Sequence, residues 1–254
     1  MAIRVGVFGA GGRMGATVCE AVAADPALEL VAAIDPAHAG EAVEGVTIVA
    51  DPNELEGDVD VVIDFTQIEA ARGNLQWAAE HGVHAVVGTS GFDESDHERL
   101  RGAFTRSNCV IAPNFAIGAV LMIVFAERAA PFFETAEVVE MHHDLKKDAP
   151  SGTAMHTAER IAAASNKWAP DPTEIVVADG ARGAQGAGGI HVHALRVRGM
   201  VASQEVIFGT EGQSLTIRHD TYDRSSFMPG VLLAVKAVAD KPGVTIGLDK
   251  LLDL

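Results

Sequence analysis

The feature that most constrains the fold is a glycine-rich turn near the start of the chain, in the run VGVFGAGGRMGATV (residues 5–18). An apolar run typical of a buried strand leads into this turn, and Met14, Val18 and Val22 follow it with helical spacing. Such a turn presents backbone N–H groups and a helix N-terminus to a ligand, and a pyrophosphate suits that position. The turn therefore favours a dinucleotide over the alternative, a plain turn that only caps a helix.

The glycines of this turn have separate tasks. Gly9 permits a tight turn, and Gly15 lets the helix lie close to the sheet. Gly11 or Gly12 permits close approach of the backbone to a ligand. The more common G-x-G-x-x-G pattern would need glycine where this chain has Met14. Because a glycine pattern alone is a weak signal, its place between a strand and a helix carries the prediction.

An acidic residue follows where a ribose ligand is expected. Asp35 ends the second strand pattern, and a carboxylate there can accept hydrogen bonds from the adenosine ribose hydroxyls. Its charge would repel the 2′-phosphate of NADPH, and Pro36 leaves no basic residue directly beside it. The sequence thus favours NADH. Arg13 and His38 could compensate in part, so NADPH stays open.

The first half of the chain alternates strand and helix patterns. This alternation predicts a parallel sheet covered by helices on both faces, in the doubly wound, Rossmann-type class of α/β folds. Strands are expected at 3–9, 28–35, 59–66, 84–91 and 108–116, and helices at 12–25, 68–82 and 94–107, the last with Ser95 or Asp96 near its cap.

The pattern changes after about residue 116, which predicts a second, α+β domain with a mixed or antiparallel sheet. Helices are expected at 117–133, 151–165 and 225–240, and strands at 135–145, 173–179, 189–199 and 203–220. We expect a dinucleotide-binding domain of residues 1–115 plus 224–254 and a second domain of residues 116–223. The glycine-rich run Gly180–Gly189 is typical of a mobile loop tip.

Loops at the carboxyl ends of the later strands are the other places where a doubly wound sheet binds ligands. Each could hold the nicotinamide half of a dinucleotide through backbone and hydroxyl groups, although each alone is more often an ordinary loop. The candidates are Asp64, Phe65 and Thr66 at the end of the third strand, Gly88, Thr89 and Ser90 after the fourth, and Ala112, Pro113, Asn114 and Phe115 after the fifth.

A second motif, VEMHHDLKKDAPSGTA (residues 139–154), gathers positive charge and proton-transfer groups. Neighbouring side chains of a strand point to opposite faces, so His142 and His143 should not face one ligand. Lys146 and Lys147 follow, and Ser151 suits the N-cap of the next helix. Free N–H groups there favour an anion, and a lysine or histidine nearby can carry protons. The alternative is a surface loop with a capped helix and one structural histidine.

Charge and cysteine content exclude several classes of protein. The net charge of −16 and the pI near 4.9 argue against nucleic acid and anionic membranes as partners. An anionic ligand therefore needs the local positive charge of the second motif. Cys19 and Cys109 are expected to be buried, reduced thiols, and no metal is expected. Without a signal-peptide pattern or a bilayer-spanning apolar run, we expect a cytoplasmic protein.

Together, these motifs resemble those of the dihydrodipicolinate reductase (4-hydroxy-tetrahydrodipicolinate reductase) family of lysine biosynthesis. The run EMHHDLKKDAPSGTA is similar to the long family signature without a gap, and GAGGRMG, DFT, GTSG and APNFAIG occur in the family's order. The resemblance covers essentially the whole chain, down to LLDL. Ser90 and Ala116 stand where a threonine and a serine are common, and Pro36 where some members use an arginine for the 2′-phosphate.

The resemblance implies reductive removal of a hydroxyl from a cyclic dicarboxylate, giving tetrahydrodipicolinate and water, with NADH and/or NADPH as cofactor and a tilt to NADH. It makes His142 the proton donor or acceptor, Lys146 the proton donor and His143 a substrate ligand. Lys147, the neighbour of Lys146, is expected to face solvent. A substrate carboxylate would be held by Ser151, Gly152 and Thr153. The cofactor would be held by Gly9, Ala10, Gly11, Gly12, Arg13, Met14, Asp35, Phe65, Thr66, Gly88, Thr89, Ser90, Ala112, Pro113, Asn114 and Phe115.

The resemblance also implies a homotetramer formed through the sheet of the second domain, and closure on substrate about joints near residues 114–117 and 222–225. Two other functions would share the dinucleotide-binding part of this pattern. A semialdehyde dehydrogenase would need a nucleophilic cysteine, and neither Cys19 nor Cys109 lies in a suitable loop. A regulator that senses NAD would need no histidine–lysine cluster and would be expected to carry a DNA-binding segment.

Overall fold

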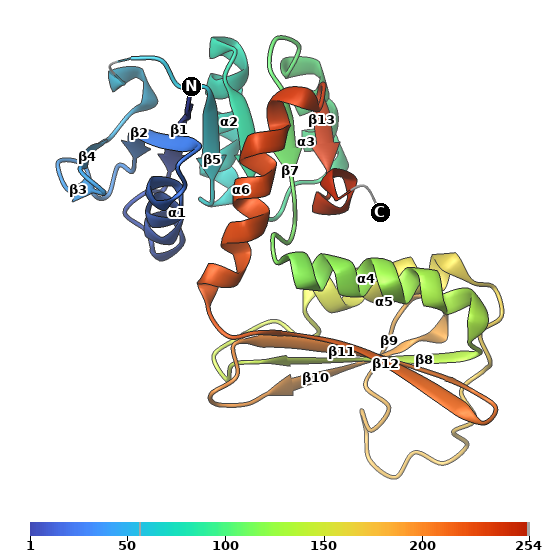
Figure 1. Cartoon of the computed structure of the whole chain (residues 1–254). Helices are drawn as coiled ribbons and strands as arrows, with labels where there is room; N and C mark the ends of the chain where they lie inside the picture. Colours follow the sequence, from blue (N-terminus) through green and yellow to red (C-terminus); the bar gives the residue numbers. More distant parts are fainter. Residues whose placement is uncertain (56, 253–254) are drawn as a thin grey trace. The chain divides into compact units, whose positions relative to one another are not determined.

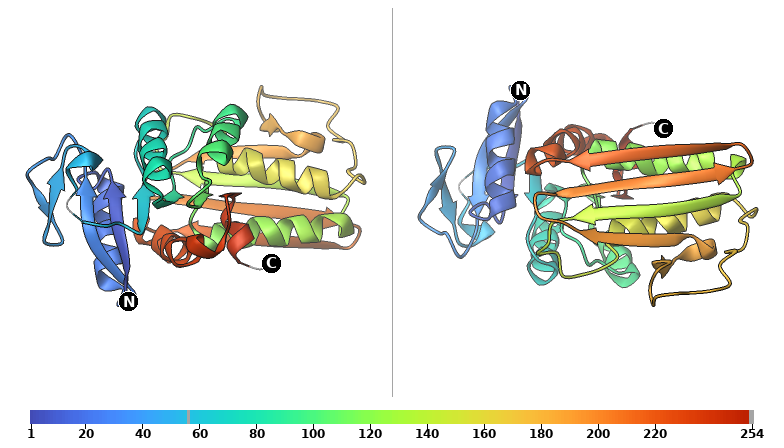
Figure 2. Two further views of the ribbon diagram at one scale, coloured as in Figure 1. Left: turned by 90° about the horizontal axis from the view of Figure 1, so that it is seen from above. Right: turned by 90° about the horizontal axis from the view of Figure 1, so that it is seen from below.

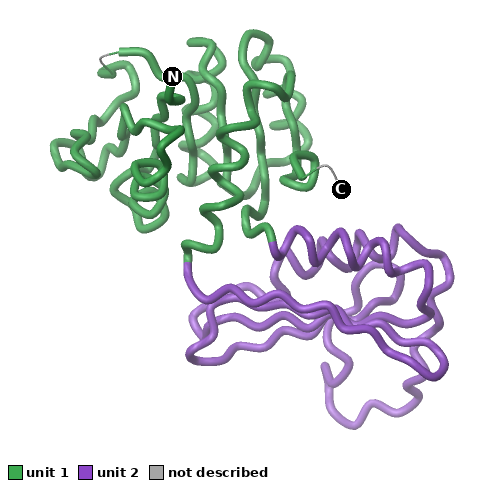
Figure 3. Tube along the Cα trace, in the orientation of Figure 1, with its two compact units in different colours: residues 1–117, 224–254 green, residues 118–223 purple. Residues whose placement is uncertain are grey.

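The computed structural model describes residues 1–55 and 57–252, which divide into two compact units. Unit 1 comprises Met1–Ile117 and Arg224–Leu254, and unit 2 comprises Gly118–Asp223 (Figure 3). Unit 1 is thus assembled from two separate segments of the chain. Among the described residues, no helix is long and apolar enough to cross a membrane.

Unit 1 is built on an eight-stranded sheet with the order β13-β7-β6-β5-β1-β2-β4-β3 (Figure 1). All neighbours in it are parallel except β3 and β4. The strands are β1 (Ile3–Phe8), β2 (Leu28–Ile34), β3 (Ala42–Val43), β4 (Val46–Val49), β5 (Val61–Asp64), β6 (His84–Val87), β7 (Cys109–Ile111) and β13 (Val244–Ile246). The five expected strands are confirmed, whereas β3, β4 and β13 were not expected.

Helices cover both faces of this sheet, which confirms the doubly wound class (Figure 1). Helix α1 packs against α6, and α2 packs against α3. The helices are α1 (Arg13–Ala24), α2 (Ile68–His81), α3 (Glu94–Ala103) and α6 (Met228–Ala237), with short 3-10 turns η1 (Pro52–Glu54), η4 (Arg224–Phe227), η5 (Val238–Asp240) and η6 (Leu248–Leu251). Strand β1 lies between β2 and β5, so the strand order proceeds in opposite directions on its two sides. In a doubly wound sheet, such a switch point leaves a crevice at the carboxyl end of the strand.

The strands of unit 1 are buried because helices cover both faces. Val5 and Val7 in β1 and Ile63 in β5 have no exposed surface, and such near-continuous apolar runs are typical of parallel sheets. Cys19 and Cys109 are also fully buried free thiols, as expected. Burial raises the pKa of the Cys19 thiol to about 12, which leaves it protonated and unreactive.

Unit 2 contains a five-stranded sheet with the order β12-β11-β8-β10-β9. Its strands are β8 (Thr135–His142), β9 (Ala184–Gln185), β10 (His191–Arg196), β11 (Ala202–Thr210) and β12 (Gln213–Thr221). Only the β8–β10 pair is parallel, so the expected mixed sheet is confirmed. Helices α4 (Ile117–Ala129) and α5 (Gly152–Ala164) pack on one face, while the view from below shows the strands of the other face in front (Figure 2). Two 3-10 turns, η2 (Ala130–Phe132) and η3 (Ala187–Gly189), complete the unit.

Two local expectations were wrong. Residues 173–179 form no strand, and Ile175 and Val177 are 79% and 93% exposed, because β9 occupies the sheet edge beside β10. The strand expected to reach residue 145 ends at His142. Ser95 and Asp96 do lie near the cap of α3, as expected: the cap is Asp93, whose carboxylate accepts the Asp96 N–H at 2.9 Å. Gly180–Gly189 contains β9 and η3, and its mobility stays a prediction.

Candidate active site

The glycine turn of unit 1 is held by contacts that only glycine permits. Gly9 has φ +73°, in the left-handed region that disfavours other residues. A Cβ at Gly15 would lie only 2.0 Å from the carbonyl oxygen of Gly9, so α1 could not sit this close to β1 with any side chain there. Helix α1 begins after Gly12, where no side chain caps it and no acidic residue lies in its first turn. Its N-terminus therefore presents backbone and partial positive charge alone.

Asp35 closes one side of this turn. Its Oδ2 accepts the Gly11 N–H at 3.1 Å and its Oδ1 accepts the Ala37 N–H at 3.0 Å. The Nδ1 atom of His38 lies 3.1 Å from Oδ2. The carboxylate is thus oriented by backbone and buried to 9% exposure at the end of β2. A ribose hydroxyl would have to share these oxygens, which carboxylates can do because each has two lone pairs.

A cavity of about 500 Å³ lies beside the turn. It brings together five of the predicted cofactor residues, and its wall is completed by residues of β1, β2 and α2. The predicted residues in its lining are Gly9, Gly12, Asp35, Phe65 and Thr66. A cavity of this size at the crevice of a doubly wound sheet suits part of a dinucleotide.

The three later loops meet around the ring of Phe65. A Cβ at Gly88 would lie 2.0 Å from this ring, and the Phe65 and Phe115 ring centroids are 5.7 Å apart. The side chains of Ala112 and Phe115 are buried, so these positions can offer a ligand their backbone only. Arg13 and Ser90 are exposed, and the Oδ1 of Asn114 accepts the Ala116 N–H at 2.9 Å.

Asp64, expected with Phe65 and Thr66 to line the cofactor site, is instead buried within the protein. Its fully buried carboxylate accepts hydrogen bonds from the hydroxyls of Thr66 and Thr89, both at 2.8 Å, and from the Asn74 amide at 2.8 Å. The hydroxyl of Thr89 is therefore engaged within the protein. Asp64 thus joins the loops after β5 and β6, a structural role that the sequence did not predict.

The second motif folds into β8, a loop and the start of α5 in unit 2. His142 is the last residue of β8 and is half-buried, whereas His143 follows the strand and is exposed. The two histidines therefore differ in surroundings, because β8 ends between them rather than because they face opposite sides of a strand. His142 and Glu140 lie on the same face of β8, because they are two residues apart in a strand. This is the face on which α5 packs.

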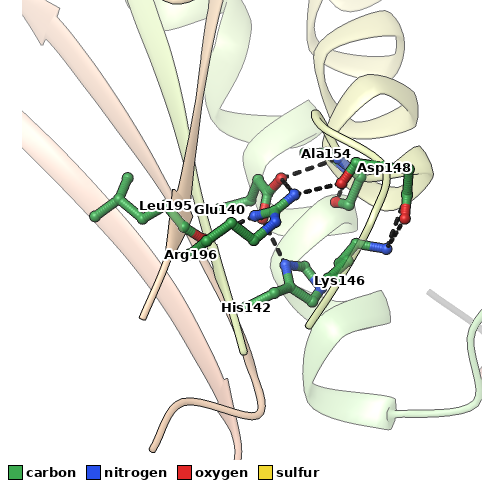
Figure 4. Close-up of polar contacts among 8 residues, drawn as sticks. Glu140, His142, Lys146, Asp148, Ala154, Leu195 and Arg196 are labelled. Atoms are coloured by element: carbon green, nitrogen blue, oxygen red, sulfur yellow. Dashed lines mark hydrogen bonds and ion pairs between the residues drawn. The ribbon is translucent and has the colours of Figure 1, made fainter. Parts of the chain in front are cut away.

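Glu140 is the centre of a buried hydrogen-bond network that includes His142 (Figure 4). Its Oε2 lies 2.5 Å from the Nδ1 of His142. Arg196 of β10 donates to both carboxylate oxygens, at 2.9 Å each, and the Ser151 N–H donates to Oε1 at 3.0 Å. Burial opposes ionisation, but the hydrogen bonds from Arg196, His142 and Ser151 outweigh it and lower the pKa of Glu140. Glu140 is therefore a carboxylate.

His142 itself is neutral near pH 7. Burial lowers the pKa of His142 below its usual value, and this outweighs the Glu140 carboxylate, which raises it. The charges of Lys146 and Arg196 lower it further. A neutral imidazole has one bare nitrogen, so His142 can accept a proton.

Lys146 lies in the loop between β8 and α5 with its side chain 22% exposed. Its ammonium binds both carboxylate oxygens of Asp148 at 2.9 Å (Figure 4). The same ion pair lowers the pKa of Asp148. Lys147 is exposed, which matches the expectation that it faces solvent. The loop thus holds one cation near His142 and leaves the other in solvent.

Helix α5 starts with the cap that the sequence predicted. The Ser151 hydroxyl accepts the Ala154 N–H at 3.2 Å, and Ser151 is 4% exposed. Gly152 is exposed, and a Cβ there would meet nothing within 4 Å. The start of α5 therefore adjoins open space at Gly152, in which an anion has room to bind.

The glycine turn of unit 1 and the β8–α5 cluster of unit 2 indicate a dinucleotide-dependent oxidoreductase. A nucleotide-binding turn and a group of proton-transfer residues are what hydride chemistry requires of a protein. Comparison with known proteins then gives the family. Residues 3–115 match the family model "Dihydrodipicolinate reductase, N-terminus" and residues 118–252 match "Dihydrodipicolinate reductase, C-terminus". The chain belongs to the dihydrodipicolinate reductase family, whose members are NAD(P)H-dependent oxidoreductases.

Relatives of known name cover the full chain. A 4-hydroxy-tetrahydrodipicolinate reductase from Nocardia farcinica is 52% identical, with 100% of both chains covered. One from Mycobacterium marinum is 48% identical, over 99% of this chain and 100% of the relative. Among solved structures, a dipicolinate-bound dihydrodipicolinate reductase from Paenisporosarcina sp. TG-14 superimposes with a TM-score of 0.88 at 35% identity, covering 98% of this chain and 99% of that one.

Proposed function

We propose that this chain is a 4-hydroxy-tetrahydrodipicolinate reductase, which uses NADH or NADPH to convert its cyclic dicarboxylate substrate into tetrahydrodipicolinate and water, in lysine (diaminopimelate) biosynthesis. The main support for this proposal is the cluster of side chains at the end of β8. There a neutral, half-buried His142 and the Lys146 ammonium accompany the open backbone at the start of α5. An acidic protein that binds a dianionic substrate needs such a local concentration of positive charge and free N–H groups.

Unit 1 suits the cofactor. The uncapped start of α1 would hold the pyrophosphate, and Asp35 in the adjoining cavity would hold the adenosine ribose. When bound, the nicotinamide supplies the hydride. The backbone of residues 88–90 and 112–115 would hold its other half. The orientation of Asp35 by two backbone N–H groups keeps negative charge beside the ribose, which supports a preference for NADH.

Unit 2 suits the substrate and the protons. The net reaction adds one hydride and one proton to the substrate and releases its hydroxyl as water. Lys146 is a cation that can pair with a substrate carboxylate and give a proton. His142 can take up a proton on its bare nitrogen and pass it on. His143, Ser151, Gly152 and Thr153 would bind the substrate, the last two through N–H groups that receive a carboxylate.

A coupled assay tests the proposed reaction. The purified chain is combined with dihydrodipicolinate synthase, pyruvate and aspartate semialdehyde, and the absorbance of NADH or NADPH is followed at 340 nm in separate reactions. We expect both cofactors to be oxidised, NADH faster. If neither cofactor is oxidised faster than in the reaction without enzyme, the proposed reaction is excluded. Faster oxidation of NADPH than of NADH would exclude the preference for NADH.

We also propose a cytoplasmic homotetramer that forms through the open face of the unit 2 sheet. Leu195 of β10 lies on that face and is 39% exposed, whereas Leu215 of β12 lies on the helix-covered face and is 38% exposed. Light scattering should give four times the chain mass of 26.5 kDa for the wild type and for Leu215→Glu, and a lower mass for Leu195→Glu. A single-chain mass for the wild type would contradict the tetramer.

A further inference from the structure

The buried carboxylate of Glu140 contacts three separate parts of unit 2, although the proposed function gives it no task. We propose that Glu140 is the positioning residue of the proton-transfer site: held by Arg196, it fixes the tautomer of His142 and ties that histidine to the start of α5. Its effect on catalysis rests on the proposed function, whereas the tautomer of His142 does not.

The hydrogen-bond geometry determines the tautomer. An ionised carboxylate can only accept hydrogen bonds, and Oε2 of Glu140 lies 2.5 Å from Nδ1 of His142. Nδ1 must therefore carry the proton and donate it to Glu140. In a neutral imidazole the other nitrogen, Nε2, is then bare and is the atom that accepts a proton.

Arg196 keeps Glu140 in the form that this role needs. A fully buried carboxylate without a cation would take up a proton and could then no longer orient the ring. Arg196 is paired in register with His142 across β8 and β10, so its guanidinium lies on the same face and reaches both oxygens of Glu140. It also donates to the Asp148 carbonyl at 2.6 Å. The loop that carries Lys146 is thereby fixed to the same network.

Glu140 also fixes the distance between His142 and the predicted carboxylate site. Its second oxygen accepts the N–H of Ser151, the N-cap of α5. One side chain thus orients the proton acceptor with Oε2 and the helix start with Oε1. A substrate held at Gly152 and Thr153 would meet His142 in one geometry, which is what efficient proton transfer requires.

The same strand offers a matched control. Glu137, three residues earlier in β8, lies on the opposite face and also pairs with an arginine and a histidine. It binds Nη2 of Arg182 at 2.5 Å and Nε2 of His193 at 2.6 Å. Unlike the buried Glu140, Glu137 has a side chain that is 31% exposed. Its bonds to Arg182 and His193 do not involve the loop between β8 and α5. Glu137→Gln therefore removes a similar carboxylate without touching the proposed site.

Nitrogen NMR of the wild-type protein gives the first test. With histidine labelled with ¹⁵N, and the His142 signal assigned by its loss in His142→Asn, we expect a protonated Nδ1 and a bare Nε2 at pH 7.5. A bare Nδ1 with a protonated Nε2 would overturn the proposal. This measurement needs neither substrate nor a stable variant at Glu140, so it decides the proposal even if the chain fails the coupled assay.

Kinetics of Glu140→Gln give the second test, because the amide keeps the volume and loses the charge. We expect kcat to fall roughly 100-fold, in the range of a misplaced general base, while the Kd for NADH is unchanged. The acid limb of the kcat profile should move to lower pH, since the carboxylate raises the pKa of His142 while Lys146 and Arg196 lower it. Asp148 faces Lys146 rather than the ring.

The control separates positioning from general stability. Glu137→Gln should keep the wild-type kcat and acid limb. If Glu140→Gln matches Glu137→Gln in both quantities, Glu140 is only a structural residue. If the wild type itself oxidises no cofactor, the proposed function fails, and the NMR signal of His142 still reports on Glu140.

Discussion

Helices α1 and α5 both begin beside a predicted ligand, but the two starts are built differently. Helix α1 has glycine at its N-cap, and no side chain satisfies its first N–H groups. Helix α5 has a serine cap whose own N–H is bound by the buried Glu140. A pyrophosphate can lie along bare backbone, whereas a reacting substrate also needs protons and fixed orientation. The difference therefore separates a site that only binds from a site that also reacts.

Glycine also serves opposite purposes at the two starts. At Gly15 the backbone of Gly9 fills the space that a side chain would need, so the glycine is a requirement of folding. At Gly152 the space is open, so packing within the protein gives no reason for a glycine. The free space is then a property that a ligand would use.

The largest expected effect comes from removing the charge beside α5. Lys146→Ala should lower kcat by roughly 10²–10⁴-fold, the usual contribution of a general acid, because no other cation takes its place in the loop. The Kd for NADH, measured by nucleotide fluorescence, should not change. Lys147→Ala is the matched control, since that neighbour is exposed and should leave kcat unaltered. Equal rates for the two variants would show that α5 works by backbone alone, as α1 does.

Gly15→Ala should have the next largest effect. The new Cβ would lie 2.0 Å from the Gly9 carbonyl oxygen, so α1 must shift away from β1. Overpacking of this kind costs about 1–3 kcal/mol, and the displaced N–H groups should weaken NADH binding. Thermal unfolding and titration calorimetry measure the two effects. An unchanged melting temperature would mean that the close approach of helix and turn is not needed.

Gly152→Ala applies the same chemical change to the other helix and should have the smallest effect. Nothing lies within 4 Å of the new Cβ, so the unfolding free energy should change by less than about 0.5 kcal/mol. The KM for the dicarboxylate should rise roughly tenfold, which corresponds to one weakened charge-assisted hydrogen bond of about 1.5 kcal/mol. A normal KM would mean that the substrate carboxylate binds elsewhere, and the start of α5 would then not be a ligand site as the start of α1 is.

Local patterns predicted much of both starts. The glycine turn and the Ser151 cap both follow from spacing within a few residues. The strands β3 and β13 are two and three residues long and could not be recognised by periodicity. The bond between Glu140 and Arg196 spans 56 residues and depends on the parallel register of β8 and β10, which no local pattern encodes. The exposed run 173–179 was mistaken for a strand because its apolar residues suggest pairing that the sheet edge does not offer.

The division of unit 1 between two segments has a consequence for how the protein is made. Strand β13 pairs with β7, and α6 packs on α1, so the last part of the chain completes the sheet that the first part begins. During translation the ribosome delivers all of residues 118–223 before it delivers these elements. Unit 2 can therefore fold as a domain while unit 1 still lacks β13 and α6. Synthesis of unit 1 thus begins before that of unit 2 and ends after it. A nascent chain that stops before residue 224 would expose the flank of α1 and the edge of β7 to chaperones.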